Sequence, residues 1–190
     1  MISREFYLQS PQAAAQKILG GTLSHGHTSG MIVETEAYSA LDDQACHTYF
    51  RPKIRRFVED HPAGTAYIYL NYGMHWLFNL IIKNPENGEM GFVLVRALEP
   101  IEGIEEMQRN RDQEAVKNLC SGPAKLTQAL SITSEFNGID TTQKLSPIQL
   151  SLPDDFSRKI LIGTRIGITK SAELPWRYGL ESSCLSKPFI

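Results

Sequence analysis

Two glutamates in the segment MIVETEAYS could carry out acid–base chemistry. Glu34 and Glu36 stand two residues apart in a predicted strand, so both would share a face with Ile32 and Tyr38, while Val33 would take the other face. Two carboxylates on an exposed strand are most often only solvated charges. A carboxylate on a rigid strand that leads directly into a loop carrying His47 is also typical of a general base. The strand alone leaves both interpretations open.

A second group of candidate residues is aromatic. The segment TAYIYLNYGMHWLFNLII predicts a β-hairpin with its turn near residues 71–73. Tyr67 and Trp76 are of the kind that fills a core, because aromatic side chains favour strands. Tyr72 differs, since it precedes Gly73 at the turn, where a side chain points away from the fold. An exposed ring near basic residues is a stacking platform for nucleic-acid bases.

Basic side chains gather just after His47, in the segment ACHTYFRPKIRRF. Arg51, Lys53, Arg55 and Arg56 would suit a grip on a polyanion such as a phosphate backbone. Arg96 interrupts the apolar segment FVLVRAL, and a buried arginine needs a carboxylate or an anionic ligand.

The segment SGPAKL places Gly122 and Lys125 at the beginning of a predicted helix, with Pro123 in its first position. This helix N-terminus could be an ordinary N-cap or a phosphate-binding site.

Metal and thiol chemistry have weaker support. His25, His27 and the Cys46-His47 pair lack the paired ligand spacing of a structural zinc site, so we predict no metal and no cofactor. Cys46 has no evident partner that would make it a nucleophile. The three cysteines, an odd number, indicate free thiols in a reducing compartment.

The elements that must hold these residues predict an α+β fold. Helices are expected over residues 11–21, 101–115 and 120–130, and strands over 31–39, 65–82 as a hairpin, 91–100 and 159–170 as a strand or hairpin. Residues 40–63 are expected to form a loop with at most one helical turn, and the C-terminus to be irregular. We expect a central, mostly antiparallel curved sheet flanked by helices, with a protruding β-hairpin, in one domain spanning 1–190.

Composition limits the function classes. The 190 residues carry a formal net charge of −2, which argues against a bulk nucleic-acid coat but allows one local basic patch. Neither a long apolar run nor a signal peptide is evident, so we expect no membrane association and no secretion. The expected location is the cytoplasm, with the nucleoid, or the nucleus in a eukaryote.

The order of the motifs VETEAY, a following His, GTAYIYLNYGMHWLFN, VLVRALEP and CSGPAKLTQAL resembles the alkyladenine (3-methylpurine) DNA glycosylase family along nearly the whole chain. The resemblance implies a monofunctional base-excision repair enzyme that flips alkylated purines of the 3-methyladenine type from double-stranded DNA and hydrolyses the N-glycosidic bond. It also implies that the protein acts on damaged DNA as a monomer.

The resemblance further assigns roles to individual residues. Glu36 would activate water, and Arg96 would belong to the positioning shell near Glu36 and the DNA backbone. Tyr38, His47, Tyr69 and Asn79 would surround the flipped base, with Asn79 beside the edge that carries the amino group in guanine. The residues implied to contact DNA are Tyr72 as a wedge, Met74, the four basic residues after His47, Gly122 and Lys125. The segment between His47 and Gly64 departs from the family pattern because it is shorter and more basic.

Two other functions fit part of the pattern. A non-catalytic module that binds damaged DNA or structured RNA would use the same aromatic and basic residues, although a base-type glutamate favours the enzyme. A glycosidase could use Glu34 and Glu36 as its two carboxylates, since residues i and i+2 of a strand can meet the required spacing.

Overall fold

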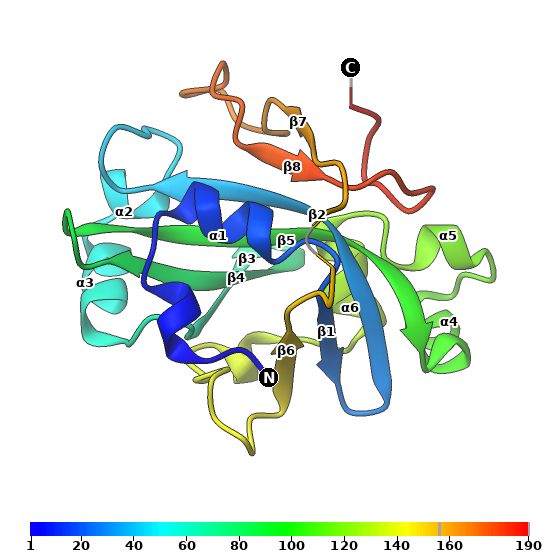
Figure 1. Cartoon of the computed structure of the whole chain (residues 1–190). Coiled ribbons are helices and arrows are strands. Elements are labelled where there is room, and N and C mark those ends of the chain that lie inside the picture. Colours follow the sequence, from blue (N-terminus) through cyan, green and yellow to red (C-terminus); the bar gives the residue numbers. More distant parts are fainter. Residues whose placement is uncertain (156, 190) are drawn as a thin grey trace.

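The computed structural model describes residues 1–155 and 157–189, and its centre is a curled sheet in which neighbouring strands run antiparallel (Figure 1). The strand order is β3-β4-β5-β2-β1-β6, and β8 pairs with both β2 and β7. The strands are β1 (Thr22–His25), β2 (Thr28–Ser39), β3 (Ala66–Asn71), β4 (His75–Asn84), β5 (Glu89–Glu102), β6 (Ile148–Ser151), β7 (Leu161–Gly163) and β8 (Arg177–Gly179). The predicted α+β class and antiparallel sheet are confirmed.

Helices flank this sheet. They are α1 (Pro11–Lys17), α2 (His47–Phe50), α3 (Pro52–Asp60), α4 (Ile104–Arg111), α5 (Val116–Leu119) and α6 (Pro123–Ala129), with short 3₁₀ helices at Arg4–Tyr7 and Ser134–Phe136. Helix α1 begins as predicted, because the Ser10 hydroxyl accepts a bond from Ala13 N and Pro11 fills the first position. It ends earlier than residue 21. The chain then bends through Gly20, whose φ of 81° suits a residue without a side chain.

The two faces of the sheet carry different side chains. On one face, apolar side chains such as Phe78, Leu80 and Ile82 of β4 pack with α1 and α6 in the main core. Figure 1 shows α1 lying along β2 and β5. The opposite face carries a smaller cluster around Cys46 and Tyr67 that α2 and α3 cover. The polar residues of interest lie on this second face.

Strand β2 departs from the predicted alternation at one point. Its pairing with β5 shifts register on both sides of Glu34, as in a β-bulge. The extra residue puts Ile32 in the main core together with Ala37, whereas Val33 packs in a separate cluster. The prediction that Ile32 shares a face with Glu34 was therefore wrong. The prediction that Val33 shares a face with Ala37 was wrong for the same reason.

Residues 40–63 are more ordered than predicted. They form α2 and α3 rather than a loop with one helical turn. Pro52 starts α3, and Ile54, Phe57 and Val58 give it an apolar face against the smaller cluster. Their i, i+3, i+4 spacing was the available signal.

Other boundaries also differ. Strand β5 continues to Glu102, so the following helix begins only at Ile104, after Gly103 with a φ of 70°. The predicted strand or hairpin over 159–170 reduces to β7, which pairs with β8 in a region expected to be irregular. Strands β1 and β6 were not predicted. Among the described residues, no helix is long and apolar enough to cross a membrane.

Candidate active site

Strand register gathers the candidate residues on the second face of the sheet. Leu94 of β5 pairs with Glu36 of β2 on one side and with Asn79 of β4 on the other. Asn79 in turn pairs with Tyr67 of β3, and Tyr38 pairs with a residue two positions from Leu94. Since directly opposite residues in a sheet point to the same face, three strands deliver their polar side chains to one place.

The site is a small, ring-lined pocket on this face. Its cavity measures about 130 Å³ and is lined by Tyr38, Ala45, His47, Tyr67, Tyr69, Asn71, Asn79, Phe92, Gly167 and Ile168. The Tyr67 ring stacks on Tyr69 and on Phe92, with centroids 5.4 and 4.7 Å apart, and the His47 ring meets Tyr69 edge-on at 4.6 Å. Flat rings held in this way offer a surface on which a planar base can stack.

Glu36 lies behind the wall of this pocket and is fully buried. The Tyr38 hydroxyl donates to Oε2 at 2.7 Å, and the main-chain N–H of Ile166 donates to Oε1 at 2.7 Å. Arg96 Nη1 stands 3.2 Å from Oε1 and compensates the charge. This carboxylate is fixed in position and reaches the pocket through Tyr38.

The hydroxyls around Glu36 remain protonated. Burial, and then the negative charge of Glu36, raises the pKa of Tyr38 well above its ordinary value. The same two causes raise the pKa of Tyr69 to about 12. Both side chains are therefore neutral hydrogen-bond donors at neutral pH.

His47 is the first residue of α2 and forms part of the pocket wall. Burial, with a further contribution from the charge of Arg51, lowers the pKa of His47 to about 4. Its Nδ1 lies 2.9 Å from the Tyr67 hydroxyl. A neutral imidazole here does not repel a cationic base.

Asn79 lines the pocket and is also bonded within the sheet. Its side chain is only 4% exposed and lines the pocket, and its Nδ2 donates to the main-chain carbonyls of Tyr67 and Leu77 at 3.1 and 3.4 Å. The sheet thus fixes the orientation of the amide.

Arg96 is only 6% exposed and lies among carboxylates. Its Nε donates to Glu34 Oε1 at 3.0 Å, while its Nη1 faces Glu36. Glu34 is also fully buried, so neither glutamate is a solvated surface charge. The burial of Arg96 supports a position beside Glu36 and gives no support to the expected contact with the DNA backbone.

The tip of the hairpin is exposed, as predicted. Tyr72 and Gly73 are the central residues of the turn and both have positive φ, 50° and 69°, while Met74 N donates to Asn71 O. The Tyr72 side chain is 81% exposed and that of Met74 71%.

The basic residues after His47 lie on α3 and at its start. All four are exposed: Arg51, Lys53, Arg55 and Arg56. Arg51 also packs over the Phe50 ring, and Arg56 forms a loose pair with Asp60 at 3.6 Å.

The other predicted phosphate contact lies apart from the pocket lining. Gly122 precedes α6, and Lys125 Nζ donates to the Ser121 hydroxyl at 3.1 Å. In the free protein this lysine is held against its own helix end.

Two alternatives lose support. Burial raises the pKa of the Cys46 thiol to about 11, so a reactive thiolate is disfavoured. Among residues 1–155 and 157–189, no group of three or more His, Cys, Asp or Glu side chains could hold a metal ion.

The sequence reasoning missed Arg165 and its partner Asp43. The Arg165 guanidinium is buried, donates to both carboxylate oxygens of Asp43 and to Ala37 O, and lies between the Tyr38 and Trp176 rings. It fixes the segment whose next residue, Ile166, donates to Glu36. The signal was an arginine inside the apolar stretch ILIGTRIGI, as with Arg96.

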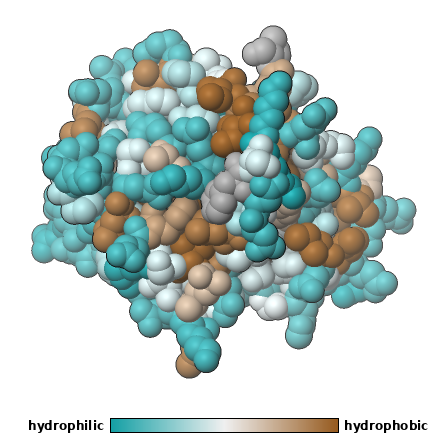
Figure 2. Space-filling view, in the orientation of Figure 1, coloured by the Kyte–Doolittle hydropathy of each residue, from teal (hydrophilic) through white to brown (hydrophobic). Residues whose placement is uncertain are grey.

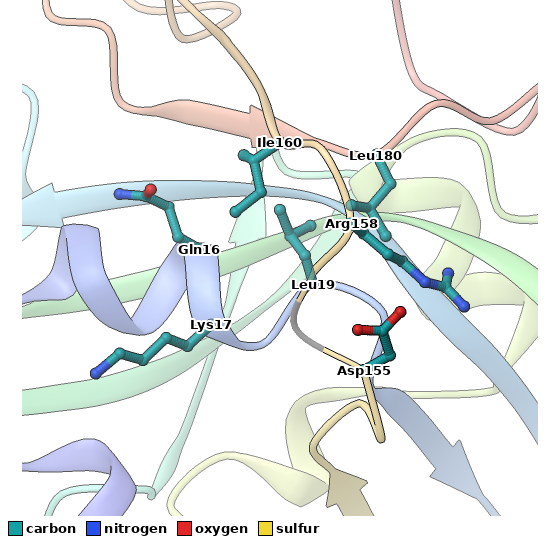
Figure 3. A pocket seen from close by; sticks show the side chains of 7 residues that line it. All are labelled: Gln16, Lys17, Leu19, Asp155, Arg158, Ile160 and Leu180. Atoms are coloured by element: carbon teal, nitrogen blue, oxygen red, sulfur yellow. The ribbon is translucent and has the colours of Figure 1, made fainter.

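A larger hollow of about 490 Å³ lies elsewhere, between α1 and the side chains of Asp155, Arg158 and Ile160 (Figure 3). Its described lining is Gln16, Lys17, Leu19, Asp155, Arg158, Ile160 and Leu180, and no aromatic ring is among these residues. The molecular face around it is largely hydrophilic with separate hydrophobic patches (Figure 2). Size alone does not make it a site for a planar base.

Comparison with known proteins identifies the family of this chain. The family model described as methylpurine-DNA glycosylase (MPG) matches residues 5–184. Proteins from Rhodopseudomonas palustris and Bradyrhizobium diazoefficiens are each 42% identical, over 100% and 99% of this chain and 89% and 92% of their own lengths. A protein from Francisella tularensis is 44% identical over 90% of both chains. All three are named "Putative 3-methyladenine DNA glycosylase". This chain belongs to the methylpurine-DNA glycosylase family.

Proposed function

We propose that the protein is a monofunctional DNA glycosylase of base-excision repair. It binds double-stranded DNA as a monomer, turns an alkylated purine of the 3-methyladenine type out of the duplex and hydrolyses its N-glycosidic bond. The observation that carries this proposal is the fully buried Glu36 carboxylate, held by three donors directly behind a ring-lined pocket. Its substrate would be chromosomal DNA, in the nucleoid of a bacterium or the nucleus of a eukaryote.

Binding energy comes from stacking and from charge. Flipping a base costs a few kcal/mol, least for a damaged base, and each aromatic stack returns about 1–3 kcal/mol. Tyr69 and His47, whose rings meet edge-on, would together form one wall against the base, and Tyr38 another. An alkylated purine that carries a positive charge also gains from electron-rich rings, by about 0.5–2 kcal/mol each.

The bond to be broken is that between the sugar C1′ and the purine nitrogen. A cationic purine leaves readily because it takes the bonding electron pair and becomes neutral. Water attacks C1′ and gives its proton to Glu36, whose negative charge also stabilises the developing sugar cation. Arg96 and the Ile166 N–H hold the carboxylate in place. No lysine nucleophile takes part, so the product is an intact strand with an abasic site.

The test uses duplexes that carry an alkylated adenine, an alkylated guanine or unmodified purines. Single-turnover release of the damaged base, without strand cleavage until alkali is added, is the expected result. Glu36→Gln keeps the shape and removes the basicity, so release should fall about 10²–10⁴-fold while the duplex still binds. Glu99→Gln, the same change at an exposed position of β5, is the matched control. Wild-type release by Glu36→Gln would remove Glu36 from the chemical step, and binding without release by the unaltered protein would indicate a non-catalytic module.

A further inference from the structure

Glu34 is a buried carboxylate for which the proposed reaction has no direct use. It has no exposed surface and accepts bonds from Arg96 Nε at 3.0 Å, Arg177 Nε at 2.8 Å, and both the N–H and the hydroxyl of Ser186 at 2.6 Å. It is absent from the lining of the pocket. Burying a carboxylate out of water is costly unless it is paired and hydrogen-bonded, and removing one member of such a group leaves the others uncompensated.

The main dependent partner is Arg96. Its Nε is occupied by Glu34 and its Nη2 donates to the Ser186 hydroxyl at 3.2 Å. Its Nη1 faces Glu36, at 3.2 Å. An unrestrained guanidinium prefers to bind one carboxylate through two parallel N–H bonds. Glu34 and Ser186 together prevent that arrangement at Glu36.

The balance of buried charges is a second reason to connect Glu34 with Glu36. Glu34, Glu36, Arg96 and Arg177 are four buried groups with two charges of each sign. Arg177 is paired with Glu36 across the β2–β8 ladder, but its side chain turns to Glu34 and to the carbonyls of the C-terminal segment at residues 187 and 188. Glu34 thus pairs with both cations, whereas Glu36 pairs with Arg96 alone.

We propose that Glu34 is a positioning residue that limits Arg96 to an ion pair through one nitrogen with Glu36 and so preserves the ability of Glu36 to accept a proton. This inference rests on the proposed function and extends it to a second carboxylate. Without the negative charge of Glu34, Arg96 would turn fully onto Glu36, and Arg177 would no longer be neutralised. Glu36 would then hold its electrons more firmly and take up the proton of water less readily.

The experiment compares the chemical step with binding. Glu34→Gln is expected to lower single-turnover base release about tenfold, the effect of about 1.4 kcal/mol on the barrier. Affinity for a duplex carrying an uncleavable abasic analogue should stay within about twofold, because Glu34 does not line the pocket. Glu99→Gln serves again as the exposed control.

Charge compensation separates this role from a merely structural one. In the double variant Glu34→Gln/Arg177→Gln, one charge of each sign is lost, so the buried group keeps its charge balance. Base release should recover to within about threefold of wild type, as a coupled pair would show. If the double variant were as slow as the single one, the charge-balance argument would be overturned.

The remaining outcomes are also decisive. A folded Glu34→Gln protein with wild-type release, or one whose binding falls in step with its release, overturns the proposal. If Glu34→Gln does not fold, Glu34→Asp keeps the charge but withdraws the carboxylate from Arg96; release a few-fold below wild type with normal binding supports the proposal, and wild-type release overturns it. Failure of the unaltered protein to release any base would instead overturn the proposed function itself.

Discussion

Two glutamates of the same strand have different surroundings. Both are fully buried, yet Glu34 contacts two arginines and Ser186, while Glu36 contacts one arginine, one tyrosine hydroxyl and one main-chain N–H. The chemistry proposed for Glu36 needs a carboxylate that is held in place but not saturated by cations. The difference depends on the bulge in β2 and on which strands lie beside each residue.

His47 should make stability depend on pH. Because its pKa is about 4 in the folded protein and near 6.5 when unfolded, the unfolded chain binds more protons between these values, and stability falls as pH decreases through this window. From pH 7 to pH 5 the loss from this group should be about 1–2 kcal/mol. Urea unfolding of wild type and His47→Gln at both pH values measures it. An identical pH response of the two proteins would contradict the burial argument.

Asn79 should govern discrimination between purines. Two main-chain carbonyls fix its amide, so it cannot turn aside to admit an additional exocyclic amino group. Asn79→Ser is expected to raise release of alkylated guanine relative to alkylated adenine several-fold, within the range of about 1–3 kcal/mol that a pocket contact can contribute to discrimination. Asn84→Ser, on the same strand but outside the pocket, is the control. An unchanged ratio of the two released bases would exclude Asn79 from selectivity.

At the scale of elements, the β3–β4 hairpin connects the pocket to the molecular surface. Its pocket-facing residues include Tyr69 and Asn79, and its turn lies only a few residues beyond them. The ladder between the strands is a rigid support. A side chain at the tip of the hairpin that inserts into DNA is therefore held at a fixed position relative to the pocket. This arrangement suits a wedge that occupies the space of a flipped nucleotide.

Tyr72 should matter for DNA and not for folding. Its side chain is 81% exposed, and its φ of 50° places a non-glycine residue in a conformation that usually costs free energy. Tyr72→Ala should leave thermal unfolding nearly unchanged and weaken binding to a duplex with an uncleavable abasic analogue by about 1–3 kcal/mol. Met74→Ala tests the neighbouring exposed side chain in the same assay. Lowered stability with normal binding would identify Tyr72 as a core residue instead.

For the whole molecule, charge distribution should outweigh net charge. The chain carries −2 overall, yet Arg51, Lys53, Arg55 and Arg56 are exposed together near the pocket wall that His47 provides. Each phosphate they neutralise should add about −0.9 to the slope of log K against log salt, so four contacts predict about −3.6. Replacing them by Gln one at a time should reduce the slope stepwise, whereas Lys144→Gln should not. A flat salt response of wild type would exclude this patch as the DNA contact.

The sequence alone determined the local features that depend on neighbouring residues. Alternation and turn chemistry predicted the hairpin, and the proline and serine at its start predicted α1, because these patterns act over a few residues. Motif order was enough to predict the family. The apolar segments around Arg96 also indicated that this arginine needs a buried partner.

The tertiary structure alone decided what depends on distant parts of the chain. Glu34 lies 62 residues from Arg96, 143 from Arg177 and 152 from Ser186, and no local pattern specifies such contacts. The bulge in β2 arises from its pairing with β5, and β1 and β6 are too short to be recognised without their partners. The residue types were visible in the sequence, but burial and strand pairing made one glutamate the candidate base and the other its support.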